Sequence, residues 1–543
     1  MMRCNNLFML QIQLRVLSCL VGFSLSLGPA LSLNLHQSYK DARTTRLFQG
    51  HDVALPYYQN LLNQNPQDVT AATRIASDPK ARASHGRLVD WNPYRVVADY
   101  QPFIQSLRDC NFNPSGIAKH IFKENPNSPA LSSSAPLYLQ PLRAGTQAPP
   151  LPTCALETCI QLFLLAVSVP ITICHQYLGE ALVDQMETMG IAFRQDNLVV
   201  PYCHITPVRC ATKTIYLATD LHPNVLSITS FDNDDRGDNM FPDEPVMYIG
   251  PDSMALVDHW NSLPRKAGEA HRIVDIGTGS GIQALTMATM LQQSPESMKT
   301  KVTCVDLNPR ALRLARLNFA WNGLPEPEWI LGDLRVEHSG RRLLDDDTMD
   351  SCDSACKPWR DWIGHATMIL SNPPFLPVPI QDDNIAKRHG LYSSGGKSGE
   401  DILRRVIEIA AACLAPDGTL AVVSELMNPQ TTLSSRLSEW WQGPGKAVLI
   451  TNEQAMDAST YSSRRADSIE EFERWLDHLS LEGISHISPG LLFIKKIGGC
   501  TDFDVSNLLV PKTIDGSIWT PTNRGVREYT RKKLTELGLY TIQ

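Results

Sequence analysis

The second half of the chain is predicted to adopt an α/β fold, because short apolar strands alternate with amphipathic helices. Residues Arg272–Ile276 are rich in β-branched side chains and run straight into glycine, which is typical of a buried strand. Apolar residues recur at helical spacing over the following segment, Ile282–Leu291. A second strand at 302–306 and a second amphipathic helix at 310–321 repeat this order. The alternation predicts strands with helices packed on them.

A glycine-rich turn joins the first strand to its helix. Gly277, Gly279 and Gly281 alternate with Thr278 and Ser280. Glycine at a strand-to-helix turn takes positive φ and lets the backbone approach a ligand closely. The ligand would lie beyond the carboxyl end of the strand, where open α/β sheets bind small molecules. The turn is therefore a candidate cofactor site, and a structural turn in another α/β domain is the alternative.

An acidic residue, Asp275, stands just before this turn and narrows the choice of ligand. The spacing is Gly-x-Gly-x-Gly, whereas dinucleotide sites have Gly-x-Gly-x-x-Gly. A carboxylate at this position would repel a pyrophosphate. It would not repel S-adenosylmethionine, which carries a cationic sulfonium and an ammonium. The turn therefore favours S-adenosylmethionine over a dinucleotide.

Two more acidic residues end the next strands. Asp306 closes the strand at 302–306, where a carboxylate can accept hydrogen bonds from ribose hydroxyls. Asp333 follows a third strand, at 329–331, and could accept from an adenine amino group. Either acid could instead cap the helix that follows it. Their order at two successive strand ends favours the nucleoside interpretation.

The fourth strand, at 368–371, ends in Asn372, Pro373, Pro374 and Phe375. The prolines stiffen this turn and leave its carbonyl groups free to accept. An amide or aromatic-amine NH₂ is a poor nucleophile because its lone pair is delocalised. The Asn372 side-chain oxygen and the Pro373 carbonyl could each accept one of its hydrogens, so that positioning rather than a strong base would promote methyl transfer. Phe375 offers a flat face on which a planar group can stack.

These motifs resemble class I S-adenosylmethionine-dependent methyltransferases of the Asn-Pro-Pro-aromatic group. The group includes HemK-like release factor glutamine methyltransferases and the amino methyltransferases of adenine and guanine. The resemblance covers residues 240–500 and implies a Rossmann-like, seven-stranded sheet whose last strand is antiparallel. It also implies that the glycine turn and Asp275 hold the amino-acid end of S-adenosylmethionine. Asp306 would hold the ribose and Asp333 the adenine, and Asn372 would orient the target nitrogen.

The motif alone leaves the substrate open, since a glutamine amide and a nucleobase amine present the same NH₂ group. The glycine-rich stretch 395–401 resembles the HemK-like branch, which makes a release factor glutamine the leading substrate. Phe375 departs from that branch, where tyrosine is usual. The formal net charge of −8 and the pI of about 6.0 lack the basic character of nucleic-acid enzymes. RNA or DNA is the alternative partner, and an inactive Rossmann-like binding scaffold is the alternative function. A small activating subunit is a further candidate partner.

A chain of 543 residues is too long for one such domain, so further parts are expected. Residues 100–225 are predicted to form a helical, winged-helix-like module that binds a nucleic acid or a protein, an assignment by fold-level analogy. The segment 246–253 is expected to enter the catalytic domain and could line the cofactor pocket. Residues 501–543 form a predicted tail without a recognisable motif.

Within the predicted module, helices are expected at 155–173 and 177–189. Strands are expected at 193–200 and 210–218, around a turn. The apolar run 160–174 is interrupted by Pro170 and is too short to span a bilayer. We therefore expect a core helix there and no stable membrane insertion of the mature domain.

Residues 1–48 are predicted to be a targeting segment, because acidic residues are absent before Asp41 while Arg3, Arg15 and Lys40 are present. The segment could be a secretory signal or an organelle transit peptide. Secretion does not suit the proposed enzyme, which needs S-adenosylmethionine, so a plastid or mitochondrial destination is favoured. A membrane anchor and a cytoplasmic location are the alternatives. The thirteen cysteines have no regular spacing, which argues against a disulfide framework. Cys352 and Cys356 have no second pair nearby, so no metal site is expected.

Overall fold

The structure is a computed structural model. It describes residues 100–122, 151–195, 197–210, 213–220, 245–260, 271–292, 300–334, 341–342, 362–379, 392–498, 502–511 and 524–536, with a few residues between 41 and 61. The predicted targeting segment 1–48 lies outside the described residues, apart from Asp41, Ala42 and Thr45. Cys352 and Cys356 also lie outside them.

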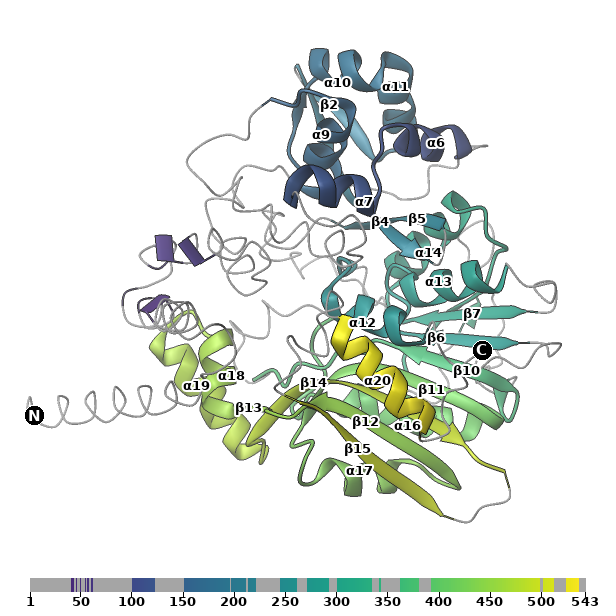
Figure 1. Ribbon diagram of the computed structural model, residues 1–543, viewed down its shortest axis with the longest axis vertical. Helices are drawn as coiled ribbons and strands as arrows, with labels where there is room; N and C mark the ends of the chain where they lie inside the picture. The colour runs from purple at the N-terminus through teal and green to yellow at the C-terminus, as the bar shows by residue number, and fades with distance from the viewer. Residues whose placement is uncertain are drawn as a thin grey trace, which may run out of the picture.

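A large sheet forms the centre of the molecule (Figure 1). In chain order its strands are β6 (Arg272–Ile276), β7 (Lys301–Asp306), β8 (Glu328–Leu331), β9 (Arg341–Arg342), β10 (Ala366–Ser371), β11 (Leu414–Met427), β12 (Gly445–Asn452), β13 (Met456–Asp457), β14 (His486–Lys496) and β15 (Phe503–Val510). Their spatial order is β15-β12-β14-β11-β10-β6-β7-β8-β9, and β13 pairs with β14. Strand β14 is antiparallel to both β11 and β12, whereas β6, β7, β8, β10 and β11 are mutually parallel. The predicted Rossmann-like sheet with an antiparallel strand is confirmed, with β14 in that role. Within the described residues the sheet has ten strands rather than the seven expected, and its last strand, β15, is parallel to β12.

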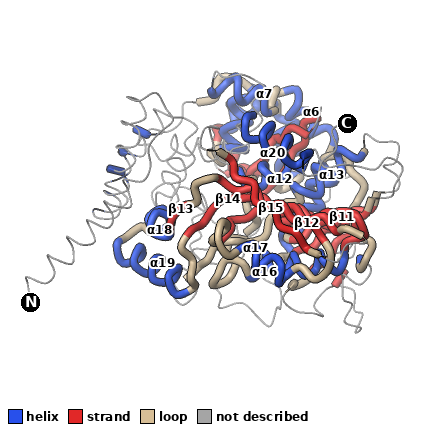
Figure 2. Tube along the Cα trace, turned by 60° about the horizontal axis from the view of Figure 1, so that its bottom comes forward, coloured by secondary structure: helices blue, strands red, loops and turns tan. Residues whose placement is uncertain are grey.

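Helices cover both faces of this sheet. In chain order they are α12 (Pro251–Trp260), α13 (Ile282–Leu291), α14 (Pro309–Trp321), α16 (Asp401–Cys413), α17 (Leu433–Trp440), α18 (Ala458–Arg465), α19 (Ile469–Leu481) and α20 (Arg524–Glu536). Figure 2 shows α12, α13 and α20 on one side of the strands and α16 and α17 on the other. Successive strand residues point to opposite faces, so Leu370 packs under α13 while Ile369 belongs to the cluster of α16 and α17.

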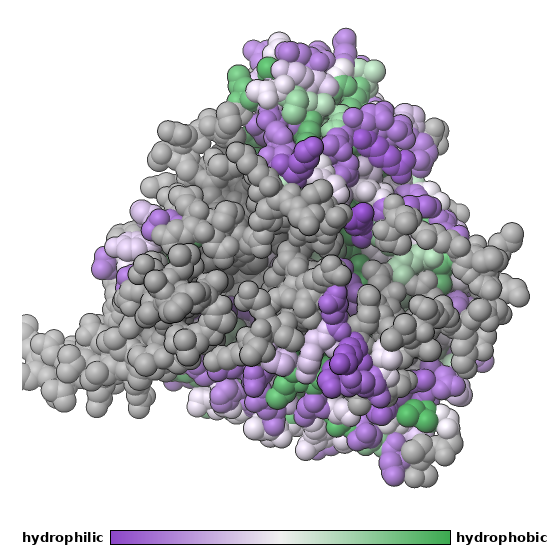
Figure 3. Space-filling view, viewed as in Figure 1, coloured by the Kyte–Doolittle hydropathy of each residue, from purple (hydrophilic) through white to green (hydrophobic). Residues whose placement is uncertain are grey.

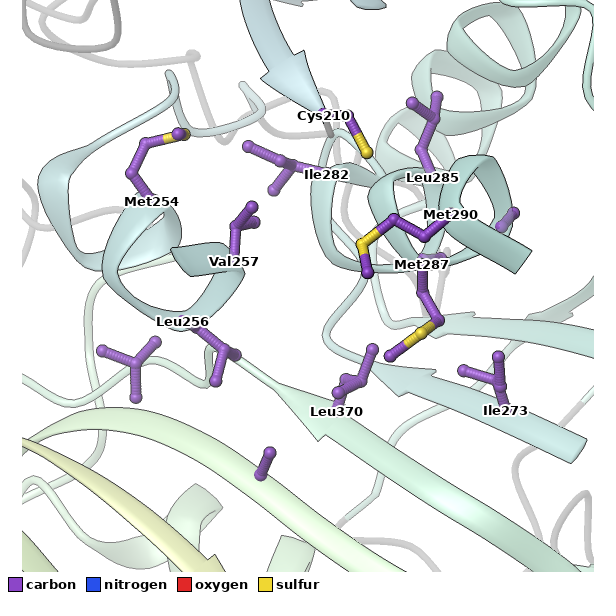
Figure 4. Close-up of a cluster of buried hydrophobic side chains, with 14 of the residues drawn as sticks. Cys210, Met254, Leu256, Val257, Ile273, Ile282, Leu285, Met287, Met290 and Leu370 are labelled. Carbon is purple, nitrogen blue, oxygen red and sulfur yellow. The ribbon is translucent and has the colours of Figure 1, made fainter. Parts of the chain in front are cut away.

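The cluster on the first face joins α12, α13 and the sheet. Figure 4 shows Met254 and Val257 of α12 beside Ile282 of α13, with Cys210 at the top of the view and Leu370 of β10 at the bottom. All five side chains are at most 4% exposed. Because α12 shares this core, the segment that precedes it is held over the carboxyl ends of the strands.

The predicted C-terminal tail is part of the catalytic sheet. Residues Phe503–Val510 form β15, which pairs in parallel with β12 over its whole length. Helix α20 packs on α12, where His259 Nε2 and Thr530 Oγ1 lie 3.0 Å apart. The boundary predicted at residue 500 therefore cuts through the fold. An edge strand carries only a weak local pattern, and this one becomes a strand through pairing with β12.

The N-terminal module lies at the top of the molecule in Figure 1. Its elements are α6 (Gln101–Asp109), α7 (Pro114–Ile117), the π-helical turn η1 (Ala118–Phe122), α9 (Ala155–Cys159), the π-helical turn η2 (Ile160–Leu164), β1 (Val169–Pro170), α10 (Ile171–Leu178), α11 (Glu180–Thr188), β2 (Ala192–Gln195) and β3 (Leu198–Pro201). The three strands form an antiparallel sheet in the order β1-β3-β2. The winged-helix-like assignment stays a prediction.

Several element boundaries predicted for this module were wrong. The helix expected at 155–173 ends before Pro170, which pairs with Leu198 in the small sheet. The helix expected at 177–189 is broken at Gly179, which has φ of 84°. The strand expected at 193–200 is a hairpin of β2 and β3. The strand expected at 210–218 begins too early: Cys210 ends β4 (Cys203–Cys210), and the expected strand corresponds to β5 (Lys213–Asp220), which pairs with β4.

Helix α14 connects the module to the catalytic domain. Its buried Trp321 lies in the core of the module, with its ring centroid 5.4 Å from that of Phe103. On the same helix, Asn318 accepts from Ala218 N at 2.7 Å and donates to Ala218 O at 2.9 Å. The amide thus pairs with the edge of β5 as a neighbouring strand would. One face of this helix thus belongs to the core of the module and another face to the core of the catalytic domain.

The face in Figure 3 mixes hydrophilic and hydrophobic residues over the N-terminal module. In the part of the chain that the structure describes, no helix is long and apolar enough to cross a membrane. The apolar run 160–174 is divided among η2, β1 and α10.

Candidate active site

A pocket lies beyond the carboxyl ends of β6, β7, β8 and β10. Four segments contribute most of its lining: 245–249 ahead of α12, the glycine turn 277–280, residues 305–308 after β7 and residues 332–334 after β8. Asn372, Pro374, Tyr392 and Ser394 line it as well. Sequence-distant residues meet there because parallel strands end at one edge of the sheet. The prediction that 246–253 lines this pocket is met by 246–249 and by Ser253.

The glycine turn has the backbone that its sequence predicts. Gly277, Gly279 and Gly281 all have positive φ, at 70°, 54° and 84°. A Cβ at Gly279 would meet no atom within 4 Å, so this glycine borders open space in the pocket. Gly281 does not line the pocket, and a Cβ there would lie 3.0 Å from the Cβ of Ala315. The last glycine therefore lets α13 pack on α14.

Thr278 ties the turn to the strands. Its hydroxyl donates to Asp275 O at 2.9 Å and accepts from Val305 N at 3.1 Å. The side chain is 3% exposed. The hydroxyl thus holds β6, β7 and the turn in one arrangement, while Thr278 also lines the pocket.

Asp306 lies in the pocket wall and supports the glycine turn. One carboxylate oxygen accepts from Gly279 N and the other from Asn308 N, each at 2.8 Å. Burial raises its pKa, and these hydrogen bonds act in the opposite direction. The helix-cap alternative for Asp306 was wrong, because the cap of α14 is Asn308, which accepts from Arg310 N at 3.0 Å. Asp333 also lines the pocket.

Asp275 lies behind the turn rather than in the pocket lining. The residue is fully buried, and its Oδ2 accepts from Ala284 N at 3.0 Å. Its Oδ1 is buried with no hydrogen-bond partner among the described residues. Burial raises the pKa of Asp275 to about 8, and the nearby Asp306 charge adds to that increase. In this structure Asp275 supports the start of α13 and does not reach the pocket, so its predicted contact with the cofactor is not seen.

Asn372 is fixed by a helix more than a hundred residues away in the chain. Its Nδ2 donates to Asp252 Oδ2 at 2.8 Å and to Ser253 Oγ at 3.0 Å. Its Oδ1 is buried and has no partner among the described residues. Ser371, just before it, donates from Oγ to Ile276 O at 2.8 Å. The side-chain oxygen is therefore the polar atom of Asn372 left for a ligand.

The rest of the Asn-Pro-Pro-Phe segment is divided between pocket and core. Pro374 lines the pocket, whereas Pro373 and Phe375 do not. Phe375 packs against the buried cluster of α18 and α19, which includes Trp475. The stacking face predicted for Phe375 is thus turned toward this cluster. Two tyrosines that the sequence did not single out, Tyr248 and Tyr392, line the pocket instead.

A second glycine-rich stretch, 394–399, packs on the Asn-Pro-Pro-Phe segment. Leu376 and Ser394 form a parallel bridge, which places 394–399 alongside it. A Cβ at Gly395 would lie 2.8 Å from Phe375 Cα, and one at Gly399 would lie 2.6 Å from Phe375 O. The stretch ends in Glu400, whose carboxylate pairs with Arg436 Nη2 at 2.8 Å. The glycines therefore allow close contact with the motif.

Asp252, Ser253, Tyr248 and Tyr392 are the residues of the site that the sequence analysis did not assign individually. The segment 246–253 was expected at the pocket, but nothing local marks Asp252 as a partner of Asn372. Described residues contain no group of three or more His, Cys, Asp or Glu side chains that could hold a metal ion.

The strand order and the glycine turn define the domain as a Rossmann-like methyltransferase fold. Six curated relatives match the chain, and those that we describe are release factor glutamine methyltransferases. The protein of Deinococcus radiodurans is 29% identical over 193 residues, which are 35% of this chain and 58% of the relative. That of Gloeobacter violaceus is 30% identical over 182 residues, or 33% of this chain and 53% of the relative. The chain thus spans about half the length of these relatives, and the resemblance seen in the sequence is confirmed.

No family model matches the chain. Solved structures that match include a predicted O-methyltransferase, Atu636, of Agrobacterium tumefaciens, at 14% identity over 49% of this chain and 90% of that chain, with a TM-score of 0.26. TrmN from Thermus thermophilus matches at 18% identity over 45% of this chain and 48% of that chain, with a TM-score of 0.23. The strand order of the large sheet defines the fold.

Proposed function

We propose that the protein is an S-adenosylmethionine-dependent N-methyltransferase that acts on the side-chain amide of a glutamine in a translation release factor. The observation that carries this proposal is the unpartnered Oδ1 of Asn372 at the end of β10, beside the glycine turn. A buried acceptor without a donor is costly unless a ligand supplies one. An amide NH₂ supplies such a donor. The relatives named above support the choice of glutamine.

The residues of the pocket fit S-adenosylmethionine. The space beside Gly279 admits a ligand against the backbone of the turn. Each carboxylate oxygen of Asp306 has one hydrogen bond from the backbone and retains a further lone pair for a ribose hydroxyl. Asp333, after β8, lines the same wall. When bound, this cofactor supplies an electrophilic methyl group on a sulfonium.

Asn372 and its neighbours would orient the nucleophile. Asn372 Oδ1 would accept one hydrogen of an NH₂ group. The carbonyl of Pro373, the next residue, would accept the other, although Pro373 does not line the pocket in this structure. Accepting both hydrogens holds the nitrogen and increases its electron density. The chain then contributes positioning and electrostatic stabilisation rather than a strong base.

The test is methyl transfer from labelled S-adenosylmethionine into a cell extract, followed by separate protease and nuclease digestion. Label released by protease, in methylated glutamine, would support the proposal. Label released by nuclease would assign the protein to the nucleobase amine methyltransferases. Measurable cofactor binding without transfer would indicate an inactive scaffold or an enzyme that needs a separate activating subunit.

Asn372→Ala should abolish transfer while the Kd for S-adenosylmethionine stays within about threefold, because the side chain acts on the nucleophile. Asn507→Ala on the exposed edge strand β15 is the control and should behave as wild type. Loss of cofactor binding in Asn372→Ala would show that the assignment of roles is wrong.

The organelle destination is a proposal of the same kind. It rests on the acid-free N-terminal segment. Fusion of residues 1–48 to a fluorescent protein tests it, and a purely cytoplasmic signal would refute it.

A further inference from the structure

We infer that Asp252, assisted by Ser253, is a positioning residue that sets the orientation of the Asn372 amide and so makes the site selective for an NH₂ nucleophile. This inference rests on the proposed function. It concerns the first turn of α12, which contacts the motif across the sheet edge.

The geometry allows only one useful orientation of the Asn372 amide. When Asp252 is ionised it can only accept hydrogen bonds, so the group that faces its Oδ2 at 2.8 Å is the NH₂ of Asn372. Burial raises the pKa of Asp252, and the hydrogen bond from Asn372 acts in the opposite direction. Ser253 Oγ accepts the second hydrogen at 3.0 Å. With both hydrogens engaged, Oδ1 is the free end of the amide. Without these acceptors the amide could turn over and present a donor to the substrate.

Asp252 is placed for this contact by several features. It is 3% exposed and lies in the first turn of α12, where a negative charge is favourable. A Cβ at Gly250 would overlap Asp252 Oδ1, so the glycine makes room for the carboxylate. Gln283 Nε2 donates to Ser253 O at 3.1 Å and ties this turn to α13. The first turn of α12 is thus packed and hydrogen-bonded before any substrate binds.

The expected consequence is discrimination among nucleophiles. In the function proposed above, Asn372 Oδ1 accepts one hydrogen of an NH₂ group and the Pro373 carbonyl accepts the other. A hydroxyl has one hydrogen and would leave one buried acceptor unpaired, which is unfavourable. Asp252 contributes by keeping the first of these acceptors in place.

Transfer into extract protein tests the inference, with the extract titrated to obtain a maximal rate and a half-saturating concentration. Asp252→Ala should lower the maximal rate by about 30-fold, the range expected for a charge-assisted hydrogen bond, while the Kd for S-adenosylmethionine is unchanged. Asp252→Asn keeps an oxygen acceptor, so its maximal rate should be at least about tenfold higher than that of Asp252→Ala. Ser253→Ala should cost less, about threefold. Asp258→Asn, six positions further along the same helix, is the matched control.

A second readout does not depend on activity. In the full chain labelled with ¹⁵N-asparagine, the Asn372 side-chain NH₂ is assigned by its absence from Asn372→Ala. Its hydrogen exchange should be slow in wild type and faster in Asp252→Ala, because a hydrogen bond protects it. If wild type transfers no label to any macromolecule, the proposed function fails, and this exchange measurement still decides the role of Asp252.

Two results would overturn the inference. One is an Asp252→Ala variant with the wild-type rate and unchanged exchange at Asn372. The other is an equal loss of rate, cofactor binding and melting temperature in Asp252→Ala and Asp252→Asn, which would show a structural role only.

Discussion

The two glycine-rich segments of the site, 277–281 and 395–399, look alike in sequence and have different physical roles. At Gly279 a Cβ would meet nothing within 4 Å, so the missing side chain leaves space in the pocket. At Gly399 a Cβ would lie 2.6 Å from Phe375 O, so the missing side chain admits another part of the protein. One segment makes room for a ligand, and the other positions the Asn-Pro-Pro-Phe segment.

A buried acid accompanies each segment, and the two acids differ as well. Asp275 stands before the first segment, with no hydrogen-bond partner for Oδ1 among the described residues. Glu400 ends the second segment and pairs with Arg436. Burial raises the pKa of both carboxyl groups. For Asp275 it reaches about 8, and for Glu400 it lies above the ordinary value. Equivalent substitutions in the two segments should therefore differ in their effects on stability, cofactor affinity and methyl transfer.

Gly399→Ala should have the largest effect. The residue has φ of 75°, and its Cβ would press on Phe375 O at 2.6 Å and on Met427 Cε at 2.8 Å. We expect a loss of about 3 kcal/mol in unfolding free energy from the positive φ and the overpacking. Displacement of the motif should lower transfer by about 100-fold. Urea unfolding and transfer rates measure both effects.

The control for Gly399→Ala is Gly483→Ala, which has φ of 67° and no atom within 4 Å of its Cβ. It should cost only the positive-φ term of about 1 kcal/mol and leave transfer intact. Equal effects of the two substitutions would contradict the packing role of the second segment.

Asp275→Asn should change the pH dependence of stability. With its pKa raised to about 8 in the folded state, Asp275 keeps a proton that the unfolded chain loses near pH 4. The unfolded state then binds fewer protons between these values, so stability is highest at low pH and falls as the pH rises toward 8, by at most about 1.4 kcal/mol per pH unit.

The asparagine variant removes this contribution and can still accept from Ala284 N. Its melting temperature should therefore fall less than that of wild type between pH 5 and pH 8. Parallel melting curves for the two proteins would show that Asp275 titrates normally.

Gly279→Ala should act mainly on the cofactor. Its φ of 54° costs about 1 kcal/mol with a side chain present. The new Cβ would occupy pocket space, so we expect the Kd for S-adenosylmethionine to rise at least about tenfold. Titration calorimetry measures the affinity. An unchanged Kd would move the cofactor away from this turn.

Glu400→Gln should have the smallest effect, below about 1 kcal/mol in unfolding free energy. The raised pKa of Glu400 means that burial outweighs the attraction of Arg436. A neutral glutamine avoids the burial cost and still accepts from Arg436. A loss of several kcal/mol on urea unfolding would show that the charge itself anchors the second segment.

Much of the catalytic fold was predictable because its signals are local. Strand periodicity, glycine at the turn after Ile276 and proline after Asn372 act within a few residues of where they stand. The positions of Gly279, Asp306 and Asn372 at one pocket follow from parallel strands ending at one edge. The errors in the N-terminal module came from Pro170 and Gly179, where one residue decided between a continuous helix and a break.

By itself, the sequence determined the strand–turn–helix order, the glycine turn and the Asn-Pro-Pro-Phe segment. Which atoms of these residues are available to a ligand depends on the packing of distant segments. Asp252 meets Asn372 across 120 positions of the chain, which no local pattern encodes. Packing likewise turned Phe375 toward the core and placed β15 on the sheet edge. The physical reason is that backbone preferences act over a few residues, whereas side-chain hydrogen bonds and burial depend on the arrangement of the whole chain.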